Sequence, residues 1–410
     1  MKIAFMVGEF PSLSETFILD QITSLIERGH TVSILAEREG RAADEHPDVA
    51  RYGLRRLARY ERLPEGFLRR LAALPSAWRG TAAEWRALDV TRFGGMAASL
   101  RLSWGAQLCG GDADFDVVQC HFGALGLKAV LLRRIGALRG RIVTAFHGED
   151  ITNYPRRFRG NHYEQLFAHG DLFLPISARW NAQLEAMGCP REKIQVHRMG
   201  IDLRHFAVRA ARPAPLVTRL LSVSRLVEKK GIGDAIRAVA RTSAPVEYVV
   251  AGDGPLRAEL KALARELGVA SRVRFVGAQA RSEVAVLLEQ ADVFIAPSVT
   301  AADGDIEGIP VSIMEAMAVG LPVISTQHSA IPELVDDGAT GLLVPERDAA
   351  ALAGCIDALA SDPDRRARMG TAGRARVADS FEMGALTTRL EELYRDLVPL
   401  RVASPAGGAS

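Results

Sequence analysis

Two glutamates, Glu307 and Glu315, stand eight positions apart in the segment EGIPVSIME. Pro310 suits a first helical turn, so we expect Glu307 at the mouth of a helix and Glu315 inside it. Helical rise separates the two by about 12 Å at most. A general acid/base pair needs closer carboxylates, about 6.5–9.5 Å apart in inverting glycosidases. The spacing therefore predicts two carboxylates that hold hydroxyl groups at opposite ends of one long ligand.

Positive charge precedes this segment in the chain. In SVSRLVEKKGI, Arg225 follows a predicted strand and Lys230 precedes a predicted helix. A planar guanidinium and a compact ammonium at the carboxyl end of a strand suit a diphosphate. Gly308 and Ile309 add backbone N–H groups at a helix N-terminus, which also favours phosphate. Two solvated surface cations would produce the same local pattern, so this site is interpreted together with the glutamates.

Two histidines follow strands in the N-terminal half. FHGEDIT places His147 at the carboxyl end of the strand RIVTAF, with Glu149 and Asp150 beside it. His121 repeats this geometry after the strand FDVVQC. A histidine in such a place is suited to proton transfer near neutral pH. The structural alternative is a histidine that caps or packs.

Short apolar runs alternate with helical patterns along the chain, which predicts parallel sheets covered on both faces. We expect strands at 2–7, 31–36, 115–120, 141–146, 171–176 and 193–198, and again at 219–224, 246–252, 272–277, 292–297 and 321–326. Two Rossmann-like halves with a cleft between them follow, and ligands bind beyond the carboxyl ends of such strands.

The predicted domains follow from this rhythm. They are an N-terminal Rossmann-like domain at 1–200 with a basic helical insertion at about 44–108, a linker at 201–216, a C-terminal Rossmann-like domain at 217–385, a helix at 386–400 that packs back on the N-terminal domain, and a disordered tail at 401–410. The insertion holds eleven arginines and four acids between residues 51 and 101. It is either a helical cover for the N-terminal sheet or a basic amphipathic surface that meets an anionic membrane or a lipid-linked acceptor.

Composition narrows the class of protein. With 410 residues, 48% hydrophobic and 24% charged, the chain is predicted to be globular and to exceed one domain. A net charge of +2 does not predict nucleic-acid binding. The four cysteines form no CxxC pair, which favours a reducing compartment. Without a signal-like start or an apolar run of about 18 residues, we expect a cytoplasmic protein.

The segment EGIPVSIME resembles the EX7E signature of family GT4 glycosyltransferases, and its flanks EAMAVGLPVIST and HSAIPELVDDGATGLLVP resemble that family too. SVSRLVEKKGI resembles the family's SRL…KKG element, and FHGEDIT its HGxD histidine motif. FPSLSETFI and APSVTAADGDIEGIP look like the colanic-acid and exopolysaccharide branch. The resemblance covers nearly the whole chain, most closely 219–345. It implies the α/β GT-B fold, with two doubly wound Rossmann-like domains facing a central cleft, the N-terminal one on the acceptor side and the C-terminal one binding the nucleotide-sugar.

The resemblance also implies roles for residues. Glu307 would contact the donor sugar and Glu315 the nucleotide ribose, while Arg225 and Lys230 neutralise the departing diphosphate. Lys230 is preferred to its neighbour Lys229 because it precedes Gly231. The expected catalytic residues are His147 and Glu307, the donor-binding residues are Arg225, Lys230, Gly277, Gln279, Glu307, Gly308, Ile309 and Glu315, and the acceptor-side residues are Ser12, Glu15, His121, Glu149 and Asp150.

The first loop departs from the family pattern. Ser12 and Leu13 occupy the positions of a common Gly-Gly pair, whereas Glu15 is retained. Two other motifs, Asp303-Gly304-Asp305 and Asp114-Phe115-Asp116, resemble the DxD metal site of the other major glycosyltransferase fold. Because Arg225 and Lys230 already supply positive charge, we expect no metal and no cofactor apart from a UDP- or GDP-sugar co-substrate.

The implied reaction is retaining transfer of a hexose to a hydroxyl of a saccharide or lipid-linked saccharide, with peripheral contact at the inner face of the cytoplasmic membrane as a further partner interaction. A sugar-nucleotide epimerase of the same fold and a catalytically silent sugar-binding partner are the alternatives. A NAD-dependent dehydrogenase is disfavoured because no GxGxxG follows the first strand.

Overall fold

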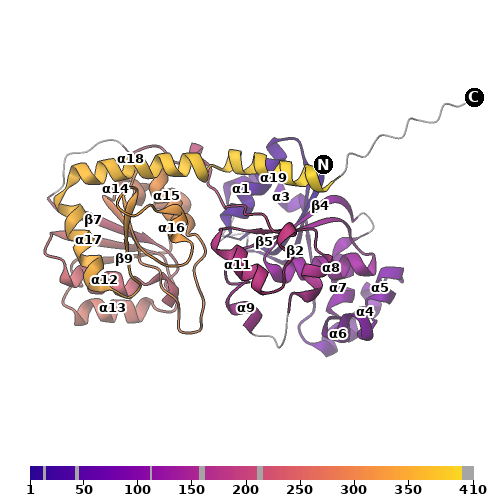
Figure 1. The fold of residues 1–410 in the computed structure, drawn as a ribbon. Helices are drawn as coiled ribbons and strands as arrows, with labels where there is room; N and C mark the ends of the chain where they lie inside the picture. Colours follow the sequence, from indigo (N-terminus) through magenta and orange to yellow (C-terminus); the bar gives the residue numbers. More distant parts are fainter. Residues whose placement is uncertain (13–14, 42–45, 111–112, 157–161, 210–215, 399–410) are drawn as a thin grey trace, which may run out of the picture.

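The computed structural model describes residues 1–12, 15–41, 46–110, 113–156, 162–209 and 216–398. Part of the expected linker and the whole of the expected tail at 401–410 lie outside the described residues. Figure 1 shows two bodies of sheet and helix side by side, connected by long C-terminal helices along one edge. No helix within the described ranges is long and apolar enough to cross a bilayer.

The N-terminal sheet has six parallel strands in the order β3-β2-β1-β4-β5-β6. Their apolar runs are buried on both faces, as expected for a covered parallel sheet. The strands are β1 (Lys2–Phe10), β2 (Thr31–Glu39), β3 (Ala58–Tyr60), β4 (Asp114–His121), β5 (Arg139–Phe146) and β6 (Leu172–Pro175).

The C-terminal sheet repeats this arrangement in the order β12-β11-β10-β7-β8-β9, again parallel. In each sheet the strand order reverses beside the first strand, which is where doubly wound folds bind ligands. The predicted α/β fold with two Rossmann-like domains is confirmed. The strands are β7 (Thr218–Val223), β8 (Val246–Ala251), β9 (Val273–Gly277), β10 (Val293–Ala296), β11 (Val323–Thr326) and β12 (Gly341–Val344).

Amphipathic helices cover both sheets. In α1, for example, Ile18, Ile22 and Leu25 recur at helical spacing and are buried against the N-terminal sheet. The N-terminal helices are α1 (Thr16–Glu27), α2 (Pro47–Arg51), α3 (Leu54–Leu57), α4 (Phe67–Ala77), α5 (Ala82–Arg86), α6 (Val90–Ala98), α7 (Arg101–Cys109), α8 (Gly123–Ile135), α9 (Asn153–Arg156), α10 (Glu164–His169) and α11 (Arg179–Ala186). The C-terminal helices are α12 (Ile232–Arg241), α13 (Arg257–Glu266), α14 (Arg281–Gln290), α15 (Val311–Ala318), α16 (Ile331–Leu334), α17 (Ala349–Ser361), α18 (Pro363–Ser380) and α19 (Met383–Leu397).

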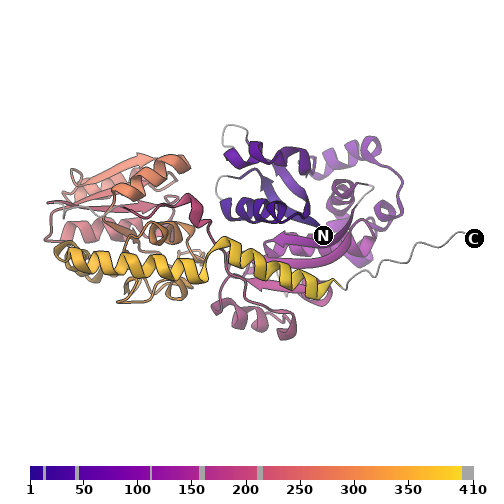
Figure 2. The same cartoon turned by 90° about the horizontal axis from the view of Figure 1, so that it is seen from above.

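The last helix returns to the N-terminal domain, as Figure 2 shows. Leu390 and Tyr394 of α19 are buried in the same core as β1 and α1. The Glu391 carboxylate lies 2.8 Å from the Arg28 guanidinium and 2.6 Å from the His30 ring. Helix α19 thus packs on the N-terminal domain, and its first turns line a small cavity beside His121 and His147 at the carboxyl ends of β4 and β5.

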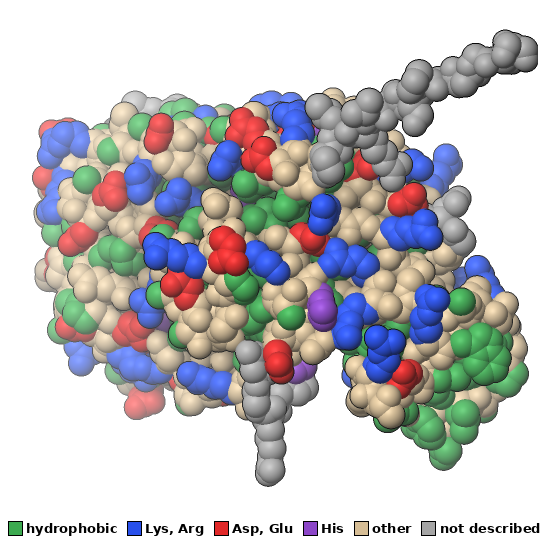
Figure 3. Space-filling view, turned by 45° about the vertical axis from the view of Figure 1, so that its right-hand side comes forward, with side chains coloured by type: hydrophobic (Ala, Val, Ile, Leu, Met, Phe, Trp, Pro, Cys, Tyr) green, Lys and Arg blue, Asp and Glu red, His purple; other side chains and the backbone are tan. Residues whose placement is uncertain are grey.

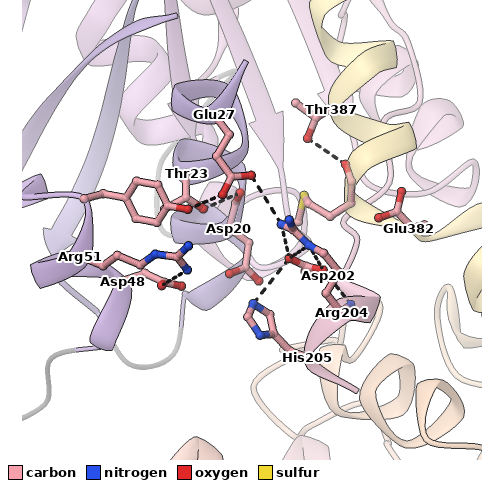
Figure 4. A network of polar contacts seen from close by, with 12 residues as sticks. Asp20, Thr23, Glu27, Asp48, Arg51, Asp202, Arg204, His205, Glu382 and Thr387 are labelled. Atoms are coloured by element: carbon pink, nitrogen blue, oxygen red, sulfur yellow. Dashed lines mark hydrogen bonds and ion pairs between the residues drawn. The ribbon is translucent and has the colours of Figure 1, made fainter. Parts of the chain in front are cut away.

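The linker is fixed by charge next to α1 (Figure 4). The Arg204 guanidinium pairs with Asp202 at 2.7 Å and reaches Glu27 of α1 at 3.5 Å. His205 lies 3.5 Å from the same Asp202 carboxylate. These groups line a polar cavity of about 430 Å³ between α1, the linker and the start of α19.

One strand prediction was wrong. Residues 193–198 form no strand; they contribute only a single bridge, between Ile194 and Phe173. The backbone N–H of His197 donates to the carbonyl of Pro175, but Pro175 has no N–H with which to continue a ladder. The short strands β3 and β12 were not predicted.

Candidate active site

Glu307 and Lys230 form an ion pair at the carboxyl ends of the C-terminal strands. Both side chains are largely buried. Burial alone would raise the pKa of Glu307, but the neighbouring ammonium groups of Lys230 and Lys229 hold it below its usual range. Gly231 makes the sharp turn after Lys230 in the left-handed region, at φ 63°, where an added Cβ would lie 1.8 Å from the Pro297 carbonyl oxygen.

The Glu307 loop is fixed from behind by His328. The Glu307 backbone N–H donates to Nε2 of His328 at 3.0 Å, and Nδ1 of His328 lies 2.6 Å from the Glu346 carboxylate. Because Nε2 accepts, Nδ1 carries the hydrogen and donates to Glu346. Sequence analysis did not single out His328 or Glu346, although both lie within or beside the segment HSAIPELVDDGATGLLVP.

Two glycines bring the domains together at this loop. A Cβ added to Gly308 would lie 2.6 Å from the carbonyl oxygen of His147, so only glycine fits there. A Cβ on Gly148 would be 3.6 Å from the Gly308 Cα. Asp150 shapes the opposite side, because its carboxylate accepts hydrogen bonds from the backbone N–H groups of Gly123, His147 and Gly148. The HGED loop and the Glu307 loop are therefore in direct contact.

His147, His121 and Gln21 form a hydrogen-bonded chain. Nε2 of His121 lies 3.1 Å from Oε1 of Gln21, and Nδ1 of His121 lies 3.1 Å from Nε2 of His147. Burial lowers the pKa of His147 to about 3 and that of His121 well below its usual value, so both rings are neutral. Phe5, Phe17 and Phe122 pack around the two rings.

The amide oxygen of Gln21, at one end of this row of hydrogen bonds, determines the direction of each bond in it. An amide oxygen only accepts, so His121 donates from Nε2 and accepts at Nδ1 from Nε2–H of His147. Nδ1 of His147 is then a bare lone pair, buried and without a hydrogen-bond partner in the described structure. Among the described residues, no carboxylate offsets the effect of burial on the His147 ring. The arrangement suits a neutral hydrogen-bond acceptor for a hydroxyl group.

Glu315 lies inside α15, the helix that follows the Glu307 loop. Burial raises its pKa to about 7, against the attraction of Arg281 and with the repulsion of Asp20. Arg281, at the start of α14, crosses to the N-terminal domain, where it lies 3.9 Å from the Asp20 carboxylate and 2.9 Å from Nε2 of His46. This crossing contact was not foreseen from the sequence.

The raised pKa of Glu315 predicts a pH dependence of stability. In the unfolded chain the pKa returns to 4.5, so protonation favours the fold. This contribution is complete below pH 4.5 and is lost as pH rises through about 7. As the pH rises from 4.5 to about 7, we expect Glu315→Gln to lose less stability than the parent chain. Thermal unfolding of both proteins at these two pH values measures the difference. Equal pH dependence of the two proteins would contradict this.

The remaining donor-side residues line the same end of the C-terminal sheet. Arg225 follows β7, is exposed, and makes no ion pair with a described carboxylate. Gly277 ends β9, and the Gln279 side chain turns back to donate to the Val276 carbonyl at 2.9 Å. Ile309 is buried behind Gly308.

The predicted acceptor-side residues separate into two groups. His121 and Asp150 are buried behind the contact between the domains, whereas Glu149 is exposed beside it. Ser12 and Glu15 line a small cavity next to His46. Burial, with the nearby Glu9 charge, raises the pKa of Glu15 to about 7.

A larger cavity, of about 620 Å³, opens where the N-terminal domain meets Ile306, the residue before Glu307. Its N-terminal wall includes Arg156, Arg179, Trp180 and Gln183. The Arg179 guanidinium lies 6.0 Å from the centre of the Trp180 ring. An indole, two guanidiniums and an amide beside the domain contact suit a sugar that carries a nearby anionic group.

The DxD-like acids are engaged within the protein. The Asp305 carboxylate pairs with Lys229 at 2.9 Å, and Asp303 accepts from the Asp305 backbone N–H at 2.9 Å. In the other motif, Asp116 accepts from the Lys2 backbone N–H at 2.7 Å. Lys229 and Lys230 are thus distinguished by their partners, and it is Lys230 that faces Glu307.

Both domains of the chain resemble known glycosyltransferases. Residues 14–205 match the family described as Glycosyltransferase Family 4, and residues 217–376 match Glycosyl transferases group 1. The putative colanic acid biosynthesis glycosyltransferase WcaL of Salmonella typhimurium is 41% identical over 97% of this chain and all of its own length. The chain therefore belongs to the glycosyltransferase family that includes WcaL. The amylovoran biosynthesis glycosyltransferase AmsK of Erwinia amylovora is 39% identical over 97% of this chain and all of its own length.

Solved structures share the fold of this glycosyltransferase. Anabaena Alr3699/HepE, solved in complex with UDP and glucose, superposes with a TM-score of 0.70 at 18% identity, over 97% of this chain and 100% of its own. Sucrose-phosphate synthase from Thermosynechococcus elongatus gives 0.69 at 22% identity, over 97% and 99%. At such identities the likeness concerns the fold, which is GT-B.

Proposed function

We propose that this glycosyltransferase is a retaining GT4 hexosyltransferase of exopolysaccharide biosynthesis. It takes a hexose from a UDP- or GDP-sugar and transfers it to a hydroxyl of a saccharide or lipid-linked saccharide. The names of the relatives that share about their whole length with this chain support the pathway class. The observation that carries the chemistry is the Lys230–Glu307 pair, held against the HGED loop of the other domain.

The donor is proposed to lie along the C-terminal strand ends. Arg225 and Lys230 neutralise the diphosphate, Glu315 accepts from the ribose hydroxyls, and backbone at Gly277 to Gln279 meets the base. Glu307 accepts from the sugar hydroxyls once the diphosphate draws Lys230 away. Stabilising the charge that develops on the leaving group is usually the largest catalytic contribution. This chain's own cations supply that stabilisation, so no metal is part of the proposal.

The acceptor is proposed to enter the cavity bounded by Arg156, Trp180 and Ile306. Its hydroxyl oxygen forms a bond to the anomeric carbon on the face from which the diphosphate departs. The carbon–oxygen bond to the diphosphate breaks, and the hydroxyl proton passes to the departing phosphate oxygen. Nδ1 of His147 accepts a hydroxyl hydrogen bond of the bound sugar and orients it. We place the reaction in the cytoplasm, with peripheral contact at the inner face of the membrane.

The experiment begins with thermal unfolding in the presence of UDP-, GDP- and ADP-sugars, because a ligand that binds the folded state raises its apparent stability. The stabilising donor is then incubated with saccharide acceptors, and the anomeric configuration of the product is determined by NMR. We expect the donor configuration to be retained. An inverted product would overturn the mechanism, an isomerised sugar without acceptor would indicate an epimerase, and binding without turnover would indicate a silent partner.

A further inference from the structure

Helix α4 (Phe67–Ala77) exposes its apolar side chains and buries a charged one. Phe67, Leu68 and Leu71 are 47%, 78% and 49% exposed. Arg70 is buried, and its guanidinium donates to the carbonyls of Pro64 at 2.9 Å and Ser99 at 3.1 Å. A surface helix of a globular protein shows the opposite pattern. Arg70 therefore fixes α4 to the domain with the apolar face outward.

The next two helices extend this face. Trp85 of α5 is 64% exposed and Val90 of α6 is 52% exposed. Five of the nine exposed large hydrophobic side chains among the described residues thus come from positions 67–90. We call Phe67, Leu68, Leu71, Trp85 and Val90 the outer apolar surface. Figure 3 shows an apolar patch with Lys and Arg side chains beside it on the lobe at lower right.

The inner side of the same helices belongs to the domain core. Ala87, Phe93 and Ala97 are buried together with residues of α7 and α8. The predicted cover for the N-terminal sheet is thus accounted for by the inner side alone. Within the outer apolar surface, Trp85 meets the Trp78 ring edge-on, with ring centroids 5.2 Å apart, and still leaves 64% of its area exposed.

The charge around the outer apolar surface is mainly positive. Six exposed arginines interleave with it along the chain, and none forms an ion pair with a described carboxylate: Arg62, Arg69, Arg79, Arg86, Arg92 and Arg101. Of the four acids in this stretch, Glu61 and Glu84 are buried, Asp89 caps α6, and Glu65 is exposed. Unpaired arginine beside exposed leucine and tryptophan is the composition of a surface that lies in an anionic lipid interface.

We propose that the outer apolar surface docks this glycosyltransferase on an anionic phospholipid bilayer, with Leu68 and Trp85 entering the headgroup boundary and the arginines meeting the lipid phosphates. The inference rests on the proposed use of a lipid-linked acceptor, since docking through the N-terminal domain brings the acceptor side to the bilayer. It favours a bilayer over a protein partner because six exposed arginines stand beside the apolar side chains against two acids that are not buried, Glu65 and Asp89.

Binding of the full chain to vesicles tests this without any turnover. Vesicles of phosphatidylcholine, with and without phosphatidylglycerol, are compared by co-sedimentation for the parent chain, Leu68→Ser/Trp85→Ser and Arg69→Gln/Arg79→Gln. We expect binding only with phosphatidylglycerol, lowered about tenfold or more by either double variant and weakened by salt. Val286→Ser, which replaces an exposed apolar residue of the C-terminal domain (50% exposed), is the control and should bind as the parent does.

Several results would overturn the proposal. Absence of vesicle binding, equal binding by the parent and both double variants, or binding that ignores phosphatidylglycerol would each do so. Self-association that Leu68→Ser/Trp85→Ser abolishes, without vesicle binding, would assign the surface to a second copy of the chain. The increase in thermal stability caused by a nucleotide-sugar should be the same in these variants as in the parent chain. If no nucleotide-sugar stabilises the parent chain, that result counts against the proposed function and not against docking.

Discussion

Replacing Lys230 by alanine is expected to lower kcat/KM for the nucleotide-sugar by about ten- to one-hundredfold, the worth of one charge-assisted hydrogen bond to the departing diphosphate. The variant should also unfold more readily. Removing one partner of a buried ion pair leaves the other charge uncompensated, which costs about 3–5 kcal/mol. The Glu307 carboxylate, paired with Lys230 in the structure, would be that charge. Initial rates and thermal unfolding measure the two effects.

The two effects can be separated within this site. In Lys230→Ala/Glu307→Gln the buried charge is gone, so stability should recover while kcat/KM stays low. Lys229→Ala is the matched control, because the neighbouring lysine pairs with Asp305 instead. Its kcat/KM should remain close to that of the parent enzyme. A Lys230→Ala enzyme with unchanged turnover would remove the diphosphate role and, with it, the main support for the proposed donor site.

The strands and the motif-bearing loops could be predicted because their signals are local. Buried parallel strands require continuous apolar runs, and the runs at 2–7 and 219–224 coincide with β1 and β7. The short strands β3 and β12 were missed because three or four residues carry little periodicity. The run at 193–198 has the right composition, but its pairing partner ends in Pro175. That is a property of a neighbour, which a local pattern does not contain.

The site residues likewise divide into those that local motifs predict and those that only long-range contacts reveal. Lys230 and Glu307 were found through their motifs, yet their mutual ion pair joins positions 77 residues apart, and neither segment alone indicates it. His328 behind the Glu307 loop and Arg281 across to Asp20 are likewise long-range contacts of residues whose immediate sequence is ordinary. Asp150 was expected on the acceptor side, but its carboxylate bonds to backbone N–H groups, a use that only the folded turn shows.

Replacing His147 by alanine is the second variant with a large expected effect, a fall in kcat of about tenfold to one-hundredfold from the loss of one oriented hydrogen bond to the bound sugar. Its pKa, lowered by burial to about 3, means that the ring stays neutral across neutral pH. The pH–rate profile of the parent enzyme should therefore show no histidine ionisation there. His169→Ala, an exposed histidine of the same domain, is the control.

Gln21 tests whether His147 acts as a neutral acceptor or as a base. Its amide oxygen makes His121 donate from Nε2 and so leaves the lone pair on Nδ1 of His147. Gln21→Leu frees His121 to take the other tautomer, and kcat should fall while the profile stays flat. Gln21→Glu keeps an acceptor but adds a charge that favours an imidazolium. It should retain activity at higher pH and acquire an acid limb as the pair becomes protonated. A parent enzyme that already shows this limb, abolished by His147→Ala, would make His147 a titrating base and exclude the neutral role.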